Sequence, residues 1–76
     1  MNTPLTLIID DEPDIRELLE ITLNRMNIRT LCAENITAAK QLLEQNKFDL
    51  CLTDMKLPDG DGLALVDFIQ NSTNPI

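Results

Sequence analysis

Three aspartates stand at the ends of two short apolar runs and are the first candidates for chemistry. Asp10 and Asp11 follow the run 5–9, and Asp54 follows the run 48–53. If these runs are neighbouring strands, the three carboxylates converge, and a hard divalent cation best relieves their mutual repulsion. All the ligands on offer are oxygens, so the pattern favours Mg²⁺ over a softer metal.

A carboxylate beside Mg²⁺ can act as a nucleophile on phosphorus, while the metal neutralises charge on the transferring group. Each aspartate taken alone is more simply explained as a helix cap or a solvated loop residue. Their occurrence together, at matching ends of two strands, favours a shared chemical role.

Three β-like stretches and three helical patterns position these acids. The stretches 5–9, 28–33 and 48–53 predict strands. Pro13 suits the first position of a helix. The spacing of the residues after it predicts one buried helical face: Ile15, Leu18, Leu19, Thr22, Leu23 and Met26.

Two more helices are expected further along the chain. Asn35 fits the N-cap of a helix that ends near Asn46. Its apolar face comprises Ile36, Ala39, Leu42 and Leu43. After a loop at 58–62, a third helix carries Leu63, Leu65, Val66, Phe68 and Ile69. The order β-α-β-α-β-α predicts an α/β fold, with a parallel sheet, right-handed crossovers and ligands at the carboxyl ends of the strands.

Composition limits the possible partners. Thirteen acidic against six basic residues give a net charge of -7, which repels nucleic-acid phosphates and anionic lipid. We therefore expect no direct nucleic acid and no membrane partner, and a cytoplasmic protein with no signal peptide at its Met1 end. Cys32 and Cys51 lie in apolar runs and are expected to behave as small buried hydrophobes. Without histidine, the chain has too few soft ligands for zinc.

The acidic motifs resemble those of a known family. The chain has Leu-Ile-Ile-Asp-Asp-Glu-Pro at 7–13, Asp-Leu-Cys-Leu-Thr-Asp at 49–54 and Leu-Pro-Asp-Gly-Asp-Gly-Leu at 57–63. These stretches resemble the receiver domains of bacterial response regulators. The resemblance implies a flavodoxin-like (CheY-like) three-layer fold. The segments 11–23 and 48–55 look most like the nitrogen-regulator type that activates sigma-54 polymerase, in particular regulators of type IV pilus expression.

The same resemblance assigns roles to residues. It makes Asp54 the phosphoacceptor for a sensor histidine kinase, in a signalling protein that is not itself an enzyme. Asp11 and Asp54 would bind Mg²⁺ directly, Asp10 would bind it through water, and the backbone carbonyl of Lys56 would be a further ligand. Pro58 and Gly62 match loop-shaping positions of the family.

The resemblance covers only the N-terminal part of a receiver. Complete receivers have five strands in the order 2-1-3-4-5, so residues 1–76 are expected to form a partial receiver domain of order 2-1-3, ending where a fourth strand begins at 75–76. The family's later Ser or Thr and its Lys are missing, which should weaken phosphoryl transfer. The open third strand predicts a homo-oligomer.

Other interpretations remain open from the sequence. The chain could be an interaction module that has lost phosphoryl chemistry. A hydrolase with an aspartate nucleophile usually has a second acid two residues later, where this chain has Lys56. A calcium loop at 59–62 lacks the ligand spacing and final Glu of an EF-hand.

Overall fold

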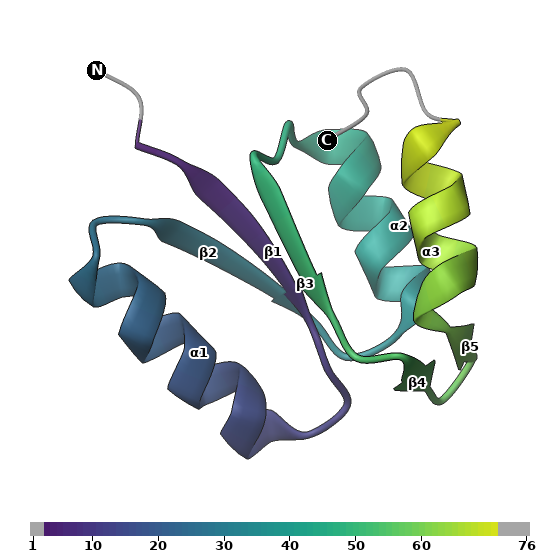
Figure 1. Ribbon diagram of the computed structural model, residues 1–76, viewed down its shortest axis with the longest axis horizontal. Coiled ribbons are helices and arrows are strands. Elements are labelled where there is room, and N and C mark those ends of the chain that lie inside the picture. The colour runs from purple at the N-terminus through teal and green to yellow at the C-terminus, as the bar shows by residue number, and fades with distance from the viewer. Residues whose placement is uncertain (1–2, 72–76) are drawn as a thin grey trace.

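Three parallel strands form the central sheet of the computed structural model, which describes residues 3–71. The strands are β1 (Leu5–Ile9), β2 (Arg29–Ala33) and β3 (Leu50–Thr53). Their order is β2-β1-β3, and β1 pairs in parallel with both neighbours (Figure 1). The predicted strand order is confirmed. The expected start of a fourth strand at 75–76 lies outside the described residues.

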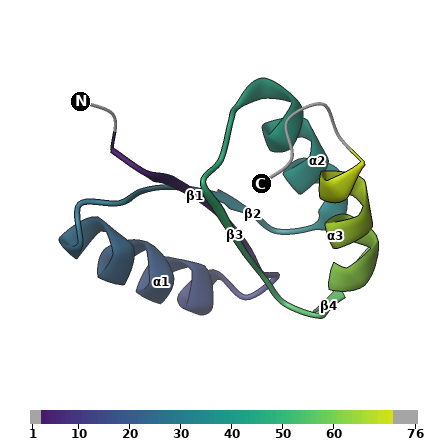
Figure 2. The ribbon, with the colours of Figure 1, turned by 45° about the horizontal axis from the view of Figure 1, so that its top comes forward.

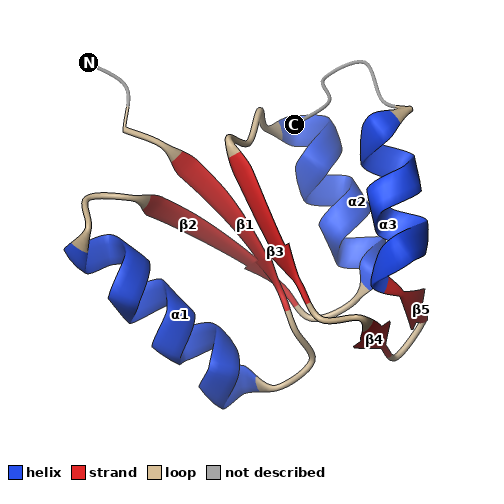
Figure 3. Cartoon of the chain, viewed as in Figure 1, coloured by secondary structure: helices blue, strands red, loops and turns tan. Residues whose placement is uncertain are grey.

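Helices cover both faces of this sheet, so the predicted three-layer fold is confirmed. They are α1 (Pro13–Arg25), α2 (Ile36–Gln45) and α3 (Gly62–Gln70). Figures 2 and 3 show α1 on one side of the strands and α2 and α3 together on the other. None of the helices in residues 3–71 combines the length and apolar character needed to cross a membrane.

Local sequence signals set where the helices begin. Pro13 occupies the first turn of α1. The Asn35 side chain accepts a hydrogen bond of 2.8 Å from the Ala38 N–H and caps α2 as predicted. The Asp61 side chain caps α3 in the same way, accepting from the Ala64 N–H at 3.0 Å.

The main core lies between the sheet and the pair α2 and α3. Alternate residues of β1 point into it, with Leu7 and Ile9 at 0% and 1% exposure. Ile36, Ala39, Leu65 and Ile69 of the two helices are buried in the same cluster. The two helices are also joined by the Lys40 ammonium, 5.0 Å from the centroid of the Phe68 ring.

The predicted buried face of α1 is wrong. No residue of α1 is buried: Ile15 and Leu18 are 37% and 60% exposed, and Met26, at the C-cap of the helix, is 62% exposed. The helix packs on β1 and β2, while the same face of β3 is left partly open, with Leu50 45% exposed. The apolar spacing therefore predicted the helix correctly. It overestimated how far the apolar face of the helix is buried by the sheet.

A small hairpin replaces the predicted loop at 58–62. Strands β4 (Lys56–Leu57) and β5 (Gly60–Asp61) pair in antiparallel fashion. Leu57 is only 9% exposed and belongs to the core cluster, so the hairpin is packed on the domain. Two-residue strands have too little periodicity to be recognised before the contacts that hold them are known.

Leucines two positions apart in α3 test this account of the core. Leu65 is fully buried, so Leu65→Ala leaves a cavity and should lower the free energy of unfolding by about 2–5 kcal/mol. Leu63 is 61% exposed, and Leu63→Ala should change it by less than about 1 kcal/mol. Urea denaturation followed by circular dichroism measures both; equal losses would contradict the assignment of the core.

Candidate functional site

Backbone hydrogen bonds place two of the three predicted acids side by side. The parallel ladder pairs Ile9 with Thr53, the last residues of β1 and β3. It continues one residue beyond each strand, because the Asp54 N–H donates to the Ile9 carbonyl at 3.0 Å. On the other edge of β1, the Asp10 N–H donates to the Ala33 carbonyl at 3.1 Å. The main chain of both acids is therefore held by the sheet.

The structure brings the three predicted carboxylates together. One carboxylate oxygen from each of Asp10, Asp11 and Asp54 lies within 4.8 Å of the other two. Asp10 is half-buried, whereas Asp11 and Asp54 are exposed. Such a cluster concentrates negative charge, and its donor atoms are all hard oxygens of the kind that Mg²⁺ or Ca²⁺ prefers.

Short-range contacts orient two members of this acidic cluster. The Asp10 side chain accepts from the Glu12 N–H at 2.9 Å, and the Asp10 carbonyl accepts from the Arg16 guanidinium at 2.6 Å. Oδ1 of Asp54 accepts from the Lys56 N–H at 3.3 Å. Lys56 thus lies beside the cluster, and the role predicted for its carbonyl oxygen remains a prediction.

Gly62 lets the hairpin lie against the main chain of the site. The Gly62 N–H donates to the Met55 carbonyl at 2.9 Å and closes the base of the hairpin. A Cβ at Gly62 would come within 2.7 Å of the Asp54 carbonyl oxygen, closer than real Cβ contacts allow. Any side chain here would push on the backbone that carries Asp54.

Asp59 makes contacts that the sequence analysis missed. Its carboxylate accepts hydrogen bonds from the backbone N–H groups of Ile36 and Thr37, at 2.8 and 3.0 Å, and from the Thr37 hydroxyl at 2.8 Å. These bonds lower the pKa of Asp59 below its ordinary value of 3.8, and the bond from the Ile36 N–H has the largest effect. Their contribution to stability is therefore present at neutral pH and is lost as the pH falls through the folded pKa. Aspartate is a common helix cap, but nothing in the sequence shows that residue 59 reaches residue 36.

A groove of about 330 Å³ opens beside the acidic cluster. Its walls combine three acids with apolar side chains of α1 and β3. They comprise Ile9, Asp10, Glu12, Ile15, Leu19, Leu52, Thr53 and Asp54. The cluster is thus open to solvent on the α1 side, where a reactant can reach it.

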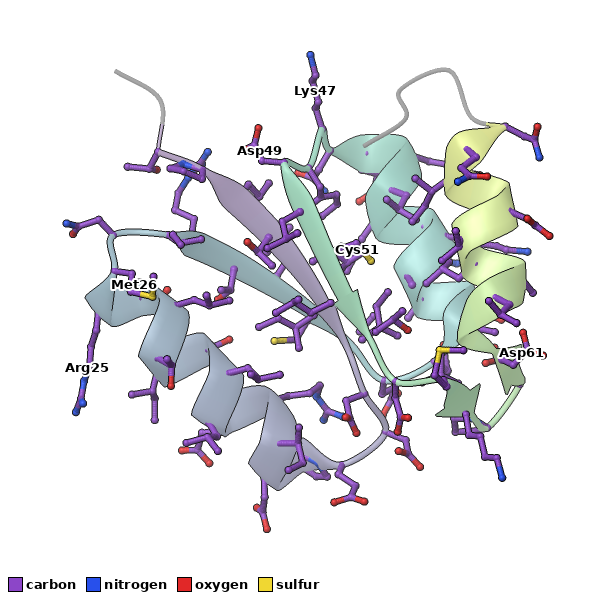
Figure 4. All side chains as sticks on the ribbon, viewed as in Figure 1. Arg25, Met26, Lys47, Asp49, Cys51 and Asp61 are labelled. Atoms are coloured by element: carbon purple, nitrogen blue, oxygen red, sulfur yellow. The ribbon has the colours of Figure 1, made fainter. Side chains whose placement is uncertain are left out.

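The two cysteines take no part in the site. Both are free and half-buried, so they are less enclosed than the small buried hydrophobes that the sequence predicted. Figure 4 shows Cys51 pointing toward the α2 side of the sheet, where it packs against the core. Burial raises the pKa of each thiol to about 11, helped at Cys32 by its hydrogen bond to Glu20. Neither thiol is a reactive thiolate at neutral pH.

Comparison with known protein families explains this geometry. Residues 6–76 match the model of the response regulator receiver domain. The chain belongs to this family. The family predicted from the acidic motifs is therefore confirmed.

Two curated relatives of the receiver chain are longer regulators. The chain is 61% identical over 70 residues to the response regulator protein PilR of Pseudomonas aeruginosa. The aligned stretch covers 92% of the chain and 16% of PilR. The predicted resemblance to this type of regulator is confirmed. It is also 40% identical to the transcriptional regulatory protein KdpE of Staphylococcus aureus, over 90% of the chain and 29% of KdpE. The chain thus spans only a small part of these relatives.

Solved receivers share the fold. The response regulator TrrA of Thermotoga maritima, solved in complex with Mg²⁺ and BeF, superposes with a TM-score of 0.88 at 31% identity, over 93% of this chain and 62% of that one. The non-phosphorylated HemR receiver domain of Leptospira biflexa gives 0.87 at 32% identity, over 93% and 57%. The chain therefore spans about three fifths of each solved protein.

The close approach at Gly62 gives a testable consequence. Gly62→Ala should shift the backbone amide resonances of Asp54 and Met55 and lower the free energy of unfolding by about 1–3 kcal/mol, because the new methyl group overlaps a carbonyl oxygen. Leu63→Ala, at an exposed neighbouring position, is the control and should leave those resonances in place. An unperturbed Asp54 amide in Gly62→Ala would contradict the proposed packing.

Proposed function

We propose that this receiver chain is the phosphoacceptor of a two-component system and takes a phosphoryl group onto Asp54 from a sensor histidine kinase. The observation that carries the proposal is the gathering of three carboxylates within 4.8 Å at the carboxyl ends of β1 and β3. Ligands of open parallel sheets bind at this edge. Membership of the receiver family supports the same role.

The donor set of the acidic cluster fits Mg²⁺. We assign Asp11 and Asp54 as direct ligands, Asp10 as a ligand through water, and the Lys56 carbonyl as a further ligand. Mg²⁺ is commonly bound by one or two carboxylates and keeps several waters, which suits an exposed cluster of three acids. When bound, it supplies positive charge against the oxygens of the transferring phosphoryl group. The complex of TrrA with Mg²⁺ and BeF supports this choice of metal.

The chain's own groups prepare Asp54 for attack. The Lys56 N–H holds Oδ1 of Asp54, which leaves Oδ2 to form the new oxygen–phosphorus bond. In the donor, the bond between phosphorus and the histidine nitrogen breaks, and that nitrogen keeps the electron pair. The product is an aspartyl phosphate, and the chain acts as an acceptor rather than as an enzyme that turns over.

We further propose that residues 1–76 are the N-terminal part of a receiver in a longer transcription regulator of the PilR type. The identity of 61% to PilR and its restriction to 16% of that protein support this. The parent would use phosphorylation of Asp54 to control sigma-54-dependent transcription, including that of pilus genes.

Phosphorylation of Asp54 can be tested directly. With Mg²⁺ and acetyl phosphate, the wild-type chain should gain the mass of one phosphoryl group by intact-mass spectrometry. Asp54→Asn removes the nucleophilic oxygen and should abolish the gain. Asp67→Asn, which removes an exposed acid of α3 outside the cluster, is the matched control and should keep it. Phosphorylation that persists in Asp54→Asn would contradict the proposal.

We also propose that the chain pairs with a second copy along β3. Within residues 3–71, β3 has a strand neighbour on one side only. Its sequence, Leu-Cys-Leu-Thr, carries no charge, and Leu50 is 45% exposed. Uncharged edge strands with unpaired backbone groups are templates for pairing with another chain.

Sedimentation equilibrium tests this pairing. The wild-type chain should form dimers or larger species, and Leu50→Lys should shift it toward the monomer because a charge beside the edge opposes pairing. Leu63→Lys places the same charge at a comparably exposed leucine of α3 and should leave the association unchanged. A folded wild-type monomer at high concentration would exclude the interface.

A further inference from the structure

The carboxylate of Asp59 joins two parts of the chain that are far apart in sequence. Asp59 lies in the turn between β4 and β5, and its three hydrogen bonds all go to the first two residues of α2. The neighbouring residue, Gly60, lies directly against the same helix end. A Cβ on Gly60 would lie only 2.6 Å from the tip of the Ile36 side chain. The turn of the hairpin therefore rests directly on the start of α2.

The first turn of α2 divides its unpaired N–H groups between two side chains. Asn35 is the N-cap of the helix and accepts from the Ala38 N–H. Asp59 accepts from the two preceding N–H groups, those of Ile36 and Thr37. Helices require such partners for their first N–H groups, and a carboxylate there also interacts favourably with the helix dipole. Here one of the two partners comes from the hairpin rather than from the helix.

The same hairpin touches the acidic cluster at its other end. The Lys56 N–H, in β4, donates to Oδ1 of Asp54. The Gly62 N–H closes the hairpin base on the Met55 carbonyl. Only a few residues separate the hairpin turn from the backbone beside Asp54. A shift of the turn would thus also move that backbone.

These contacts form a closed ring around the site. The Asp10 N–H bonds the Ala33 carbonyl at the end of β2, and α2 begins three residues later at Ile36. From Ile36 the ring crosses to Asp59, follows the hairpin back to Asp54, and returns through the bond from the Asp54 N–H to the end of β1. Asp59 closes this ring with a side chain that can be changed without altering any of the clustered acids.

We propose that Asp59 is a positioning residue for the phosphoacceptor site: by fastening the β4–β5 turn to α2, it holds the Lys56 backbone against Asp54. The inference rests on the proposed function, since it concerns the geometry in which Asp54 and the Lys56 carbonyl meet Mg²⁺. Asp59 touches neither the metal nor the phosphoryl group in this account. It acts through the hairpin.

A matched pair of variants separates positioning from helix stability. Asp59→Ala and Asn35→Ala each remove a cap from α2, but only Asp59→Ala releases the hairpin. We expect Asp59→Ala to weaken Mg²⁺ binding about three- to ten-fold, which is at or below the lower end of the loss for residues that directly support a metal ligand, because Asp59 acts through the hairpin. Asn35→Ala should lower stability yet leave the Mg²⁺ affinity unchanged. Thr37→Val, which removes one of the three bonds to Asp59, should give a smaller loss of affinity.

Amide hydrogen exchange provides a second readout that needs no metal. In Asp59→Ala, the Lys56 and Gly62 amides should exchange faster than in wild type, whereas Asn35→Ala should leave them protected. The proposal is overturned if Asp59→Ala retains both wild-type Mg²⁺ affinity and wild-type protection, or if Asn35→Ala reproduces its effects. Failure of the proposed function would show differently, as a wild-type chain that is not phosphorylated at Asp54, and the exchange rates would still decide whether Asp59 holds the hairpin.

Discussion

The parallel pairing of β1 with β2 and β3 is the constraint on which the site depends. Its register pairs Ile9 with Thr53, so the residues that follow, Asp10 and Asp54, leave the sheet at the same edge. The bond from the Asp54 N–H to the Ile9 carbonyl extends that register to the acid itself. A slip of one residue would turn every side chain of the slipped strand to the opposite face and separate the carboxylates. The same pairing that buries Leu7 and Ile9 thus brings like charges together.

The clustering of like charges destabilises the fold locally, and the same repulsion favours the binding of a cation. Three carboxylates within 4.8 Å repel one another, and the cost is relieved when a cation binds among them. The surrounding chain supplies rigidity: Arg16 holds the Asp10 carbonyl, and the hairpin holds Asp54 through Lys56. The core between the sheet and α2 and α3 stabilises this frame, while the α1 side leaves the cluster open to reactants.

Local patterns in the sequence predicted the main strands and helices well, because elements with strong apolar periodicity can be recognised from the sequence alone. The strand 5–9 was predicted with its observed bounds, and Asn35 was correctly predicted as a cap. The second and third strands begin one and two residues later than predicted. What the sequence could not supply depends on contacts between distant segments, namely the β4–β5 hairpin, the reach of Asp59 to α2, and the exposed face of α1. The roles of the clustered acids in metal binding also remain predictions.

The most direct measurement of the central claim is a calorimetric titration of the chain with Mg²⁺, because the cluster is proposed as a single oxygen site. The account predicts one Mg²⁺ bound per chain, with binding strongly weakened in Asp11→Asn and in Asp54→Asn, since each variant removes a direct ligand. Asp14→Asn, at an exposed acid in the first turn of α1 and outside the cluster, should bind like wild type. Absence of Mg²⁺ binding by the folded wild-type chain, or binding that is unaffected by the loss of Asp11 and Asp54, would contradict it.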